Sequence, residues 1–210
     1  GVAHFVYLSS IKAAGERSPP GRALSGDDAS APEDDYGRSK LAAEEAVAEI
    51  WRDAALVVLR PPLVYGAGQR GNLARLCAHL ERGLPLPCAW PPNRRSLVQV
   101  DNLADALVLA LDCTGVGPRC YTLADAHLSG GELVRAVARA LGLEARLWPL
   151  PAPLLRSLAW APRVGPALAR LAEDLVVDAE AIARDLGWRP RISFEAGIAA
   201  ACTAWREARR

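Results

Sequence analysis

The sequence of 210 residues has no methionine, no C-x-x-C pair and no long uninterrupted apolar segment. Glycine stands first and the strand-like run Phe5–Leu8 follows at once, so we expect a natural start further upstream. Five scattered cysteines, an odd number, argue against a disulfide framework or a zinc site and predict reduced thiols in the cytoplasm. The most apolar late segment, Leu154–Val177, contains three arginines and two prolines, which excludes a simple membrane span.

An excess of charge of either sign is also absent. Lysine and arginine total 25 and aspartate and glutamate 24, a net charge of +1, so no overall field favours nucleic acid or an anionic membrane. No two of the three histidines have metal-ligand spacing, and we expect no metal site. A hydrophobic share of 51% is enough to bury one sizeable core with a small annex.

The first part of the chain alternates between the two kinds of secondary structure. We predict a strand at His4–Leu8, a long loop at Arg17–Asp35, a helix at Tyr36–Ile50 and a strand at Ala54–Leu59. A strand-helix-strand order predicts a parallel, doubly wound α/β sheet, with ligands at the carboxyl ends of its strands. Ser10 and the Pro61-Pro62 turn follow such ends.

The rest of the chain has a mixed pattern. Residues 1–66 are expected to form the C-terminal part of a Rossmann-like domain, and residues 67–210 mainly a small mixed α/β substrate domain, with segments near 96–112 returning to the first. The expected elements are a helix at Asn72–Arg82, a Pro-rich loop to Pro92, a strand at Ser96–Val100, a helix that Asp101 caps, a strand at Arg119–Leu123, a helix at Leu133–Leu141 behind a Ser129/Glu132 capping box, short elements at Arg146–Leu150, helical pieces at Pro151–Asp174, and helices at Ala179–Leu186 and Phe194–Ala208.

Tyr36 and Lys40 are the residues with the clearest chemical potential. Four positions apart on a helix, they project from the same face at the carboxyl edge of the sheet. An ammonium charge favours the phenolate form of a nearby tyrosine, and such a pair can exchange a proton with a substrate hydroxyl. Ser10 ends the preceding strand with a hydroxyl that can hydrogen-bond a substrate oxygen. The alternative is an exposed helix face that carries both residues by chance.

These residues belong to a longer series of motifs: Phe5-Val-Tyr-Leu-Ser-Ser10, Tyr36-x-x-x-Lys40, Arg60-Pro-Pro-Leu-Val-Tyr-Gly66, the helix that begins at Asn72, Arg95-Ser-Leu-Val-Gln-Val-Asp-Asn102 and Leu186-Gly-Trp-Arg-Pro190. In this order and spacing the sequence resembles the extended short-chain dehydrogenases, the NAD-dependent epimerase/dehydratase family of UDP-glucose 4-epimerase and its polysaccharide-synthesis relatives.

The resemblance implies a role for each matching residue. Tyr36 would be the catalytic acid and base, Lys40 would bind the nicotinamide ribose and tune Tyr36, and Ser10 would hold the reacting sugar hydroxyl. Asn72 and Arg95 would bind the diphosphate of a UDP-sugar or similar substrate, for which an amide and a guanidinium are suited. For Arg95, a surface salt bridge is the alternative. The cofactor, NAD or NADP, would contact Ser9, Tyr36, Lys40 and Pro62.

The resemblance also implies a glycine-rich cofactor loop, which we expect about one hundred residues upstream of Gly1. The chain by itself would then hold dinucleotide poorly and be inactive. Gly66-Ala-Gly-Gln-Arg-Gly71 fits G-x-G-x-x-G, but no acidic residue ends a strand about twenty positions later, so we do not assign it to the pyrophosphate.

The expected reaction is hydride transfer at a sugar carbon by a UDP-sugar 4-epimerase or a related dehydratase or reductase, with no nucleic-acid or membrane partner and a homodimer as one possible assembly. Two alternatives stay open. One is a reductase of a small hydrophobic ketone, such as a steroid or flavonoid, and the other is a non-catalytic relative that serves as a binding or scaffold domain. The sequence leaves the sugar, and the choice between NAD and NADP, undecided.

Overall fold

The computed structural model describes residues 4–51, 55–68, 71–90, 92–113, 118–151, 153–154 and 173–209. The chain forms two compact units. Unit 1 comprises Gly1–Val64, Ser96–Asp125 and Leu175–Arg191, and unit 2 comprises Tyr65–Arg95, Ala126–Asp174 and Ile192–Arg210. Most of the helical pieces expected between Pro151 and Asp174 lie outside the described residues.

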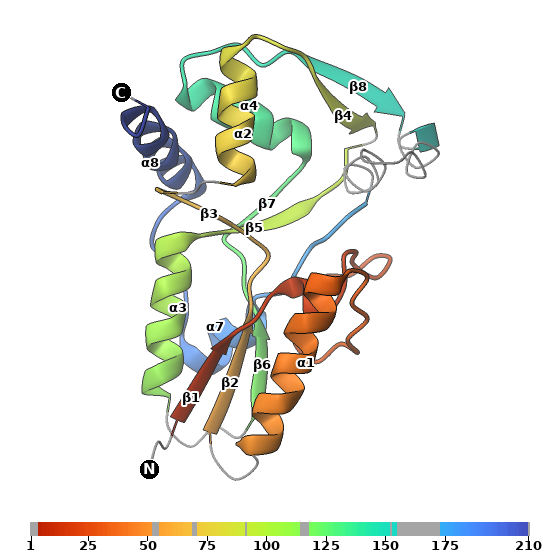
Figure 1. The fold of residues 1–210 in the computed structure, drawn as a ribbon, viewed down its shortest axis with the longest axis vertical. Helices are drawn as coiled ribbons and strands as arrows, with labels where there is room; N and C mark the ends of the chain where they lie inside the picture. The colour runs from red at the N-terminus through yellow and green to blue at the C-terminus, as the bar shows by residue number, and fades with distance from the viewer. Residues whose placement is uncertain are drawn as a thin grey trace. The chain divides into compact units, whose positions relative to one another are not determined.

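Unit 1 is built on a parallel sheet in the order β1-β2-β6 (Figure 1). Its strands are β1 (His4–Leu8), β2 (Ala55–Arg60) and β6 (Arg119–Thr122), with Val6 opposite Val57 and Val58 opposite Cys120. The continuous apolar run of β2 is buried on both faces, as a central parallel strand requires. The parallel strands and their crossover helices confirm the predicted α/β class.

Helices cover both faces of this sheet. On one face, α3 (Val100–Asp112) and α7 (Glu180–Leu186) pack on alternate strand residues around the fully buried Trp188, whose indole N–H donates to the Asn102 carbonyl at 3.0 Å. On the other face lies α1 (Asp35–Ile50), which confirms the helix predicted there. The core of the first face consists of Val57, Leu59, Val98, Leu103, Ala106, Ala110, Tyr121, Leu123, Ile182 and Trp188.

The start of α3 differs from the prediction that Asp101 caps it. Gln99, the last residue of β5 (Arg95–Gln99), is the N-cap: its Oε1 accepts hydrogen bonds from the backbone N–H groups of Asp101 and Asn102 at 2.5 and 2.9 Å. Asp101 lies in the first turn instead, where its charge is favourable toward the helix dipole. The long side chain of Gln99 thus folds back and caps the helix, which is the role that the sequence predicted for the shorter Asp101.

Unit 2 contains α2 (Asn72–Glu81), α4 (Gly130–Ala140) and α8 (Phe194–Glu207), together with a two-stranded parallel sheet. The Ser129/Glu132 capping box of α4 is present as predicted. The predicted Pro-rich loop is wrong in part, because its residues form β4 (Leu86–Trp90), which pairs with β8 (Leu147–Pro151). A proline is tolerated there because each strand of a two-stranded sheet has one unpaired edge.

Two very short strands, β3 (Leu63–Tyr65) and β7 (Ala126–Leu128), were not predicted. His127 is the central residue of β7. Three residues are too few to establish a period-two pattern, so the sequence carries little signal for either strand.

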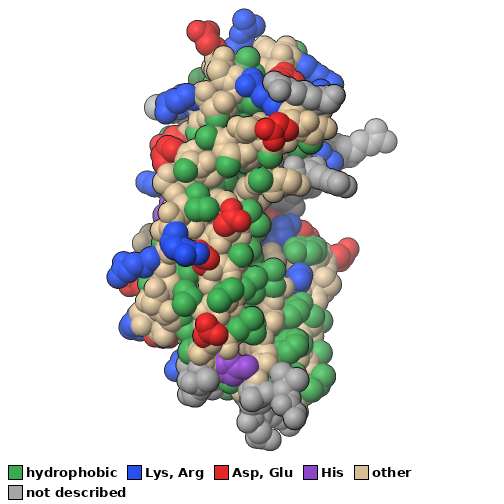
Figure 2. Space-filling view, turned by 90° about the vertical axis from the view of Figure 1, so that its left-hand side faces the viewer, with side chains coloured by type: hydrophobic (Ala, Val, Ile, Leu, Met, Phe, Trp, Pro, Cys, Tyr) green, Lys and Arg blue, Asp and Glu red, His purple; other side chains and the backbone are tan. Residues whose placement is uncertain are grey.

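Unit 1 exposes an apolar surface (Figure 2). Among the described residues, β1 is at the edge of its sheet and its side chains are half-buried or exposed, and Ile50 at the end of α1 is 79% exposed. The exposed residues of α3 include Val100, Val108, Leu109 and Leu111. In the described ranges, no helix combines the length and apolar character needed to cross a bilayer.

Candidate functional site

The end of β1 and the turn after β2 lie side by side in unit 1. The backbone N–H of Ser9 donates to the Leu59 carbonyl at 2.8 Å, and that of Ile11 donates to the Pro61 carbonyl at 2.9 Å. Pro62 follows and is buried. Ser10 leaves the strand as the N-cap of a single 3-10 turn, η1 (Ile11–Ala13), with its Oγ accepting from the Lys12 N–H at 3.3 Å. Ser9, Ser10 and Pro62 are thus brought to one sheet edge.

Tyr36 lies in the first turn of α1, because Asp34 caps that helix. The Asp34 Oδ1 accepts from the Gly37 N–H at 2.8 Å. Tyr36 is 52% exposed, which is a high fraction for a large aromatic side chain. Its phenol therefore faces solvent rather than the core.

Gly37 explains how α1 comes so close to η1. A Cβ on this residue would overlap the Lys12 carbonyl oxygen and lie 3.0 Å from Cβ of Pro32. No side chain fits in that space, so the helix that carries Tyr36 rests directly on the turn that Ser10 caps. The motif Tyr36-Gly-x-x-Lys40 therefore has a packing requirement between its two reactive residues.

Lys40 is held against β1. Its ammonium donates to the Leu8 carbonyl at 3.1 Å and lies 5.2 Å from the centroid of the Tyr7 ring, within the range of a cation–π contact. An ammonium has three N–H donors, so this contact leaves Lys40 with capacity for a ligand hydroxyl. The side chain is anchored two residues before Ser10.

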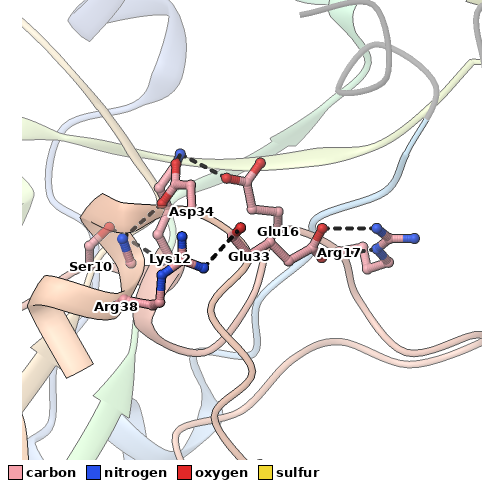
Figure 3. A network of polar contacts seen from close by, with 8 residues as sticks. Ser10, Lys12, Glu16, Arg17, Glu33, Asp34 and Arg38 are labelled. Atoms are coloured by element: carbon pink, nitrogen blue, oxygen red, sulfur yellow. Dashed lines mark hydrogen bonds and ion pairs between the residues drawn. The ribbon is translucent and has the colours of Figure 1, made fainter. Parts of the chain in front are cut away.

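A network of charges joins η1 to the loop before α1 (Figure 3). Lys12 forms ion pairs with Asp34 and, at 2.8 Å, with Glu16, and Arg17 donates to both carboxylate oxygens of Glu33 at 3.1 and 2.9 Å. The hydrogen bond from Lys12, followed by that from the Gly37 N–H, lowers the pKa of Asp34 to about 2. At neutral pH the carboxylate that caps α1 is therefore fully ionised.

Beneath these residues is a buried ion pair that sequence reasoning missed. Arg60 donates from Nε and Nη2 to the two carboxylate oxygens of Glu44 at 3.0 and 2.5 Å, and both side chains are less than a tenth exposed. The Ser9 hydroxyl also donates to Glu44, and Arg60 Nη2 donates to Ser30 Oγ at 2.9 Å. The sequence offered two signals for this pair: an arginine that ends a buried strand, and a glutamate one turn after Lys40.

The other two candidate residues, Asn72 and Arg95, belong to unit 2. Asn72 is the exposed first residue of α2, after Gly71, which gives no side-chain cap. Arg95 is half-buried, and its Nη1 donates to the Glu173 carbonyl at 3.4 Å. Neither residue lines the larger cavity of this unit.

That cavity, of about 740 Å³, lies between β4, β8 and the start of α4. Sequence reasoning singled out none of its residues as part of a site, although Asn93 lies two positions before Arg95. Polar groups of an amide, a hydroxyl, a carboxylate and a guanidinium share it with apolar side chains. The lining residues are Cys88, Pro92, Asn93, Ser129, Gly131, Glu132, Arg135, Leu147, Pro149 and Pro151.

The chain is similar to several known enzymes. The UDP-glucose 4-epimerase of Vibrio cholerae is 34% identical over 214 residues, which cover 99% of this chain and 65% of that protein. The 2-alkyl-3-oxoalkanoate reductase of Stenotrophomonas maltophilia (strain K279a) is 29% identical over 231 residues, covering 94% of this chain and 67% of that one. The crystal structure of Thermus thermophilus UDP-glucose 4-epimerase in complex with NAD has a TM-score of 0.75 and 25% identity, covering 99% of this chain and 65% of that one.

The chain therefore spans about 65% of the length of the UDP-glucose 4-epimerases it matches. The model of the NAD dependent epimerase/dehydratase family matches residues 1–124, which include β1, α1 and β2 and more than half of the sequence. The resemblance seen in the motifs is confirmed, and the chain belongs to the NAD dependent epimerase/dehydratase family.

Proposed function

We propose that this chain supplies the catalytic and substrate-binding parts of an NAD(P)-dependent nucleotide-sugar epimerase, dehydratase or reductase, and in the first place of a UDP-sugar 4-epimerase. The observation that carries the proposal is the contact of Gly37 with the Lys12 carbonyl. Through it, the start of the helix that carries Tyr36 and Lys40 rests on the turn that Ser10 caps, so that the phenol and the Ser10 hydroxyl can act on one substrate oxygen with the Lys40 ammonium on the same helix.

In this proposal Tyr36 takes the proton from a sugar hydroxyl while Ser10 holds that oxygen by a hydrogen bond. Lys40, which the Leu8 carbonyl holds against β1, offers its remaining N–H donors to hydroxyls of the cofactor ribose. A bound nicotinamide would supply the hydride acceptor. When the ketone is reduced again, Tyr36 returns the proton to the same oxygen.

For the substrate we propose a UDP-sugar bound by unit 2. Arg95 and Asn72 offer a guanidinium and an amide for a diphosphate. The cavity beside β4 and β8 adds the amide of Asn93 and the guanidinium of Arg135 to an apolar lining, a combination suited to a nucleoside. The relative in Vibrio cholerae, a UDP-glucose 4-epimerase, supports the same substrate class.

A second candidate is the reduction of a small hydrophobic ketone. Pro92, Leu147, Pro149 and Pro151 give the cavity a largely apolar wall, and the relative in Stenotrophomonas maltophilia is a 2-alkyl-3-oxoalkanoate reductase. A neutral ketone needs no diphosphate clamp, so the two candidates differ in what Arg95 does.

Isothermal titration of the protein with UDP, UDP-glucose and a medium-chain 3-oxoalkanoate separates them. If Arg95 binds phosphate, Arg95→Ala weakens binding of UDP and UDP-glucose by about 10- to 100-fold, since a hydrogen bond to a charged group contributes about 1.5–3 kcal/mol. Arg139→Ala, an exposed change on α4, is the matched control and leaves binding unchanged. Binding of the oxoalkanoate alone would favour the second candidate. Folded protein that binds none of the three ligands would contradict both.

A further inference from the structure

Glu44 is a buried acid in the middle of α1. The buried residues of this helix are Gly37 and Glu44, and the Glu44 side chain is 8% exposed. Glutamate is almost never buried unless it is paired, and here Arg60, the last residue of β2, is the partner. A buried ion pair stabilises a fold little, because apolar side chains of similar volume often serve as well. The burial of Glu44 therefore points to a role other than stability.

Tyr36, Lys40 and Glu44 form one stripe along α1, because residues four positions apart share a face of a helix. The stripe begins at Tyr36, which is 52% exposed, and becomes buried at Glu44. Its last two members bind consecutive residues at the end of β1. Lys40 donates to the Leu8 carbonyl at 3.1 Å, and the Glu44 carboxylate accepts from the Ser9 hydroxyl. Two successive turns of the helix thus hold the residues that lead to the candidate catalytic serine.

Glu44 also joins this point to the neighbouring strand β2. Arg60 donates from Nε and Nη2 to the two Glu44 oxygens at 3.0 and 2.5 Å. The backbone N–H of Ser9 donates to the carbonyl of Leu59, the residue before Arg60, at 2.8 Å. Ser9 is therefore held by its backbone to β2 and by its hydroxyl to α1, so it cannot slide or turn without breaking one of these bonds.

Ser10 acquires a fixed direction from this arrangement. It is extended, with φ −154° and ψ 150°, and in extended backbone neighbouring side chains point to opposite sides. Because the Ser9 hydroxyl is bound inward at Glu44, the Ser10 side chain is directed away from the buried pair. There its Oγ accepts from the Lys12 N–H at 3.3 Å. A shift of Ser9 would carry the Ser10 hydroxyl with it.

We propose that Glu44 is a positioning residue of the candidate active site. Through the Ser9 hydroxyl it fixes the end of β1 against α1, and so it sets where the Ser10 hydroxyl lies relative to the Tyr36 phenol. Arg60 compensates the charge that this role places in the core. The inference rests on the proposed function, in which Ser10 and Tyr36 act on one substrate oxygen. Since a misplacement of about 1 Å at a reacting group can cost roughly 100-fold in rate, Glu44 affects turnover without touching the substrate.

The test compares two serines that bind the same buried pair, in the full-length protein that carries this chain. Ser9 donates to Glu44, and Ser30 accepts from Arg60 Nη2 at 2.9 Å. With UDP-glucose as substrate, we expect kcat to fall about 10- to 100-fold in Ser9→Ala while KM changes little, and both constants to stay near their original values in Ser30→Ala. Equal effects in the two variants would mean a purely structural pair. A rise in KM alone in Ser9→Ala would make Ser9 a ligand contact, and either result overturns the proposal.

A double variant separates positioning from stability. Glu44→Leu with Arg60→Met removes both buried charges and, with them, the acceptor of the Ser9 hydroxyl. We expect this variant to fold and to show the same fall in kcat as Ser9→Ala. Adding Ser9→Ala to it should cause no further fall, because both changes break one link. Turnover that recovers together with stability would overturn the proposal.

Amide hydrogen exchange, followed by NMR, gives a readout that does not need turnover. The backbone N–H of Ile11 donates to the Pro61 carbonyl at 2.9 Å, just beyond the point that Glu44 holds. We expect this amide to exchange about 10-fold faster in Ser9→Ala than in Ser30→Ala, while the amides of β6 exchange equally in both. If the unaltered protein does not turn over UDP-glucose, the proposed function fails, and exchange alone decides whether Glu44 fixes the end of β1. Equal exchange of Ile11 in the two variants overturns the inference.

Discussion

Removal of either partner of the Glu44–Arg60 pair is the sharpest test of how unit 1 supports its site. Glu44→Gln leaves the Arg60 charge buried without its carboxylate, and Arg60→Met leaves the carboxylate buried beside the Ser9 hydroxyl, which alone cannot neutralise it. Each change leaves one charge without its partner in a site where both side chains are less than a tenth exposed.

The expected magnitude follows from that burial. Breaking one side of a buried ion pair typically lowers the free energy of unfolding by about 3–5 kcal/mol. Replacing both partners, as in Glu44→Leu with Arg60→Met, removes both charges and leaves the hydroxyls of Ser9 and Ser30 with one partner fewer, at about 1–3 kcal/mol in total. We therefore expect the double variant to be more stable than either single one.

Urea unfolding at pH 7, followed by circular dichroism, measures these differences. The control is the pair Asp35–Arg38 on the same helix, where Asp35 is 99% exposed. Asp35→Asn should change the free energy of unfolding by less than about 0.5 kcal/mol. The reasoning is refuted if Glu44→Gln costs no more than the control, or if the effects of the two single changes simply add in the double variant.

Three further changes probe the site from other sides. Asp34→Ala should lower the free energy of unfolding by about 1–2 kcal/mol and Asp34→Asn by less, because an amide oxygen also caps a helix. The pKa of Asp34, lowered by Lys12 to about 2, means that the charge-dependent part of this stability is present above about pH 4 and lost as pH falls through 2. The difference in urea midpoint between the unaltered protein and Asp34→Asn should therefore shrink from pH 7 to pH 2, and a constant difference would contradict the ion pair. Gly37→Ala should cost about 2 kcal/mol or more, since its methyl group would overlap the Lys12 carbonyl oxygen, whereas Ser39→Ala, at an exposed position of the same helix, should stay within about 0.5 kcal/mol. In the protein that carries this chain, Tyr36→Phe should reduce turnover by about 100-fold or more without loss of stability, because the ring is 52% exposed. Turnover close to normal in that variant, with Ser39→Ala as the active control, would exclude Tyr36 as the acid and base.

The elements with long, regular patterns could be predicted from the sequence. The apolar run before Ser9, the helix that starts beside Tyr36 and the capping box at Ser129 each have a local cause in side-chain pattern or in a short-range hydrogen bond. The strand β4 could not, because its pairing with β8 joins segments far apart in the chain, and Pro87 within it and the prolines on either side argue locally for a loop. Pairing with the distant strand β8 is what makes these residues a strand and not a loop.

The candidate site likewise has features that the sequence predicts and features that it does not. The spacing of Tyr36 and Lys40 is a local property of one helix, and so it is visible in the sequence. The role of Gly37 is not, because it depends on the Lys12 carbonyl, which reaches the helix only after the loop between them has folded back. The Glu44–Arg60 pair is equally long-range, and a single charged residue at the end of an apolar strand does not identify its partner.

The contacts around Tyr36 differ in how strongly they can fix its position. The ion pair Arg17–Glu33 is well exposed, and a pair of this kind contributes little net stability. The contact at Gly37 and the bond from Lys40 to the Leu8 carbonyl involve the backbone, which has far fewer alternative positions than a long charged side chain. The site should therefore keep its shape when surface charges around the loop are changed or screened by salt, and lose it when the packing of α1 on η1 is altered. Loss of the site by salt screening alone would mean that the charge network of Figure 3, rather than the backbone contact, sets the position of Tyr36.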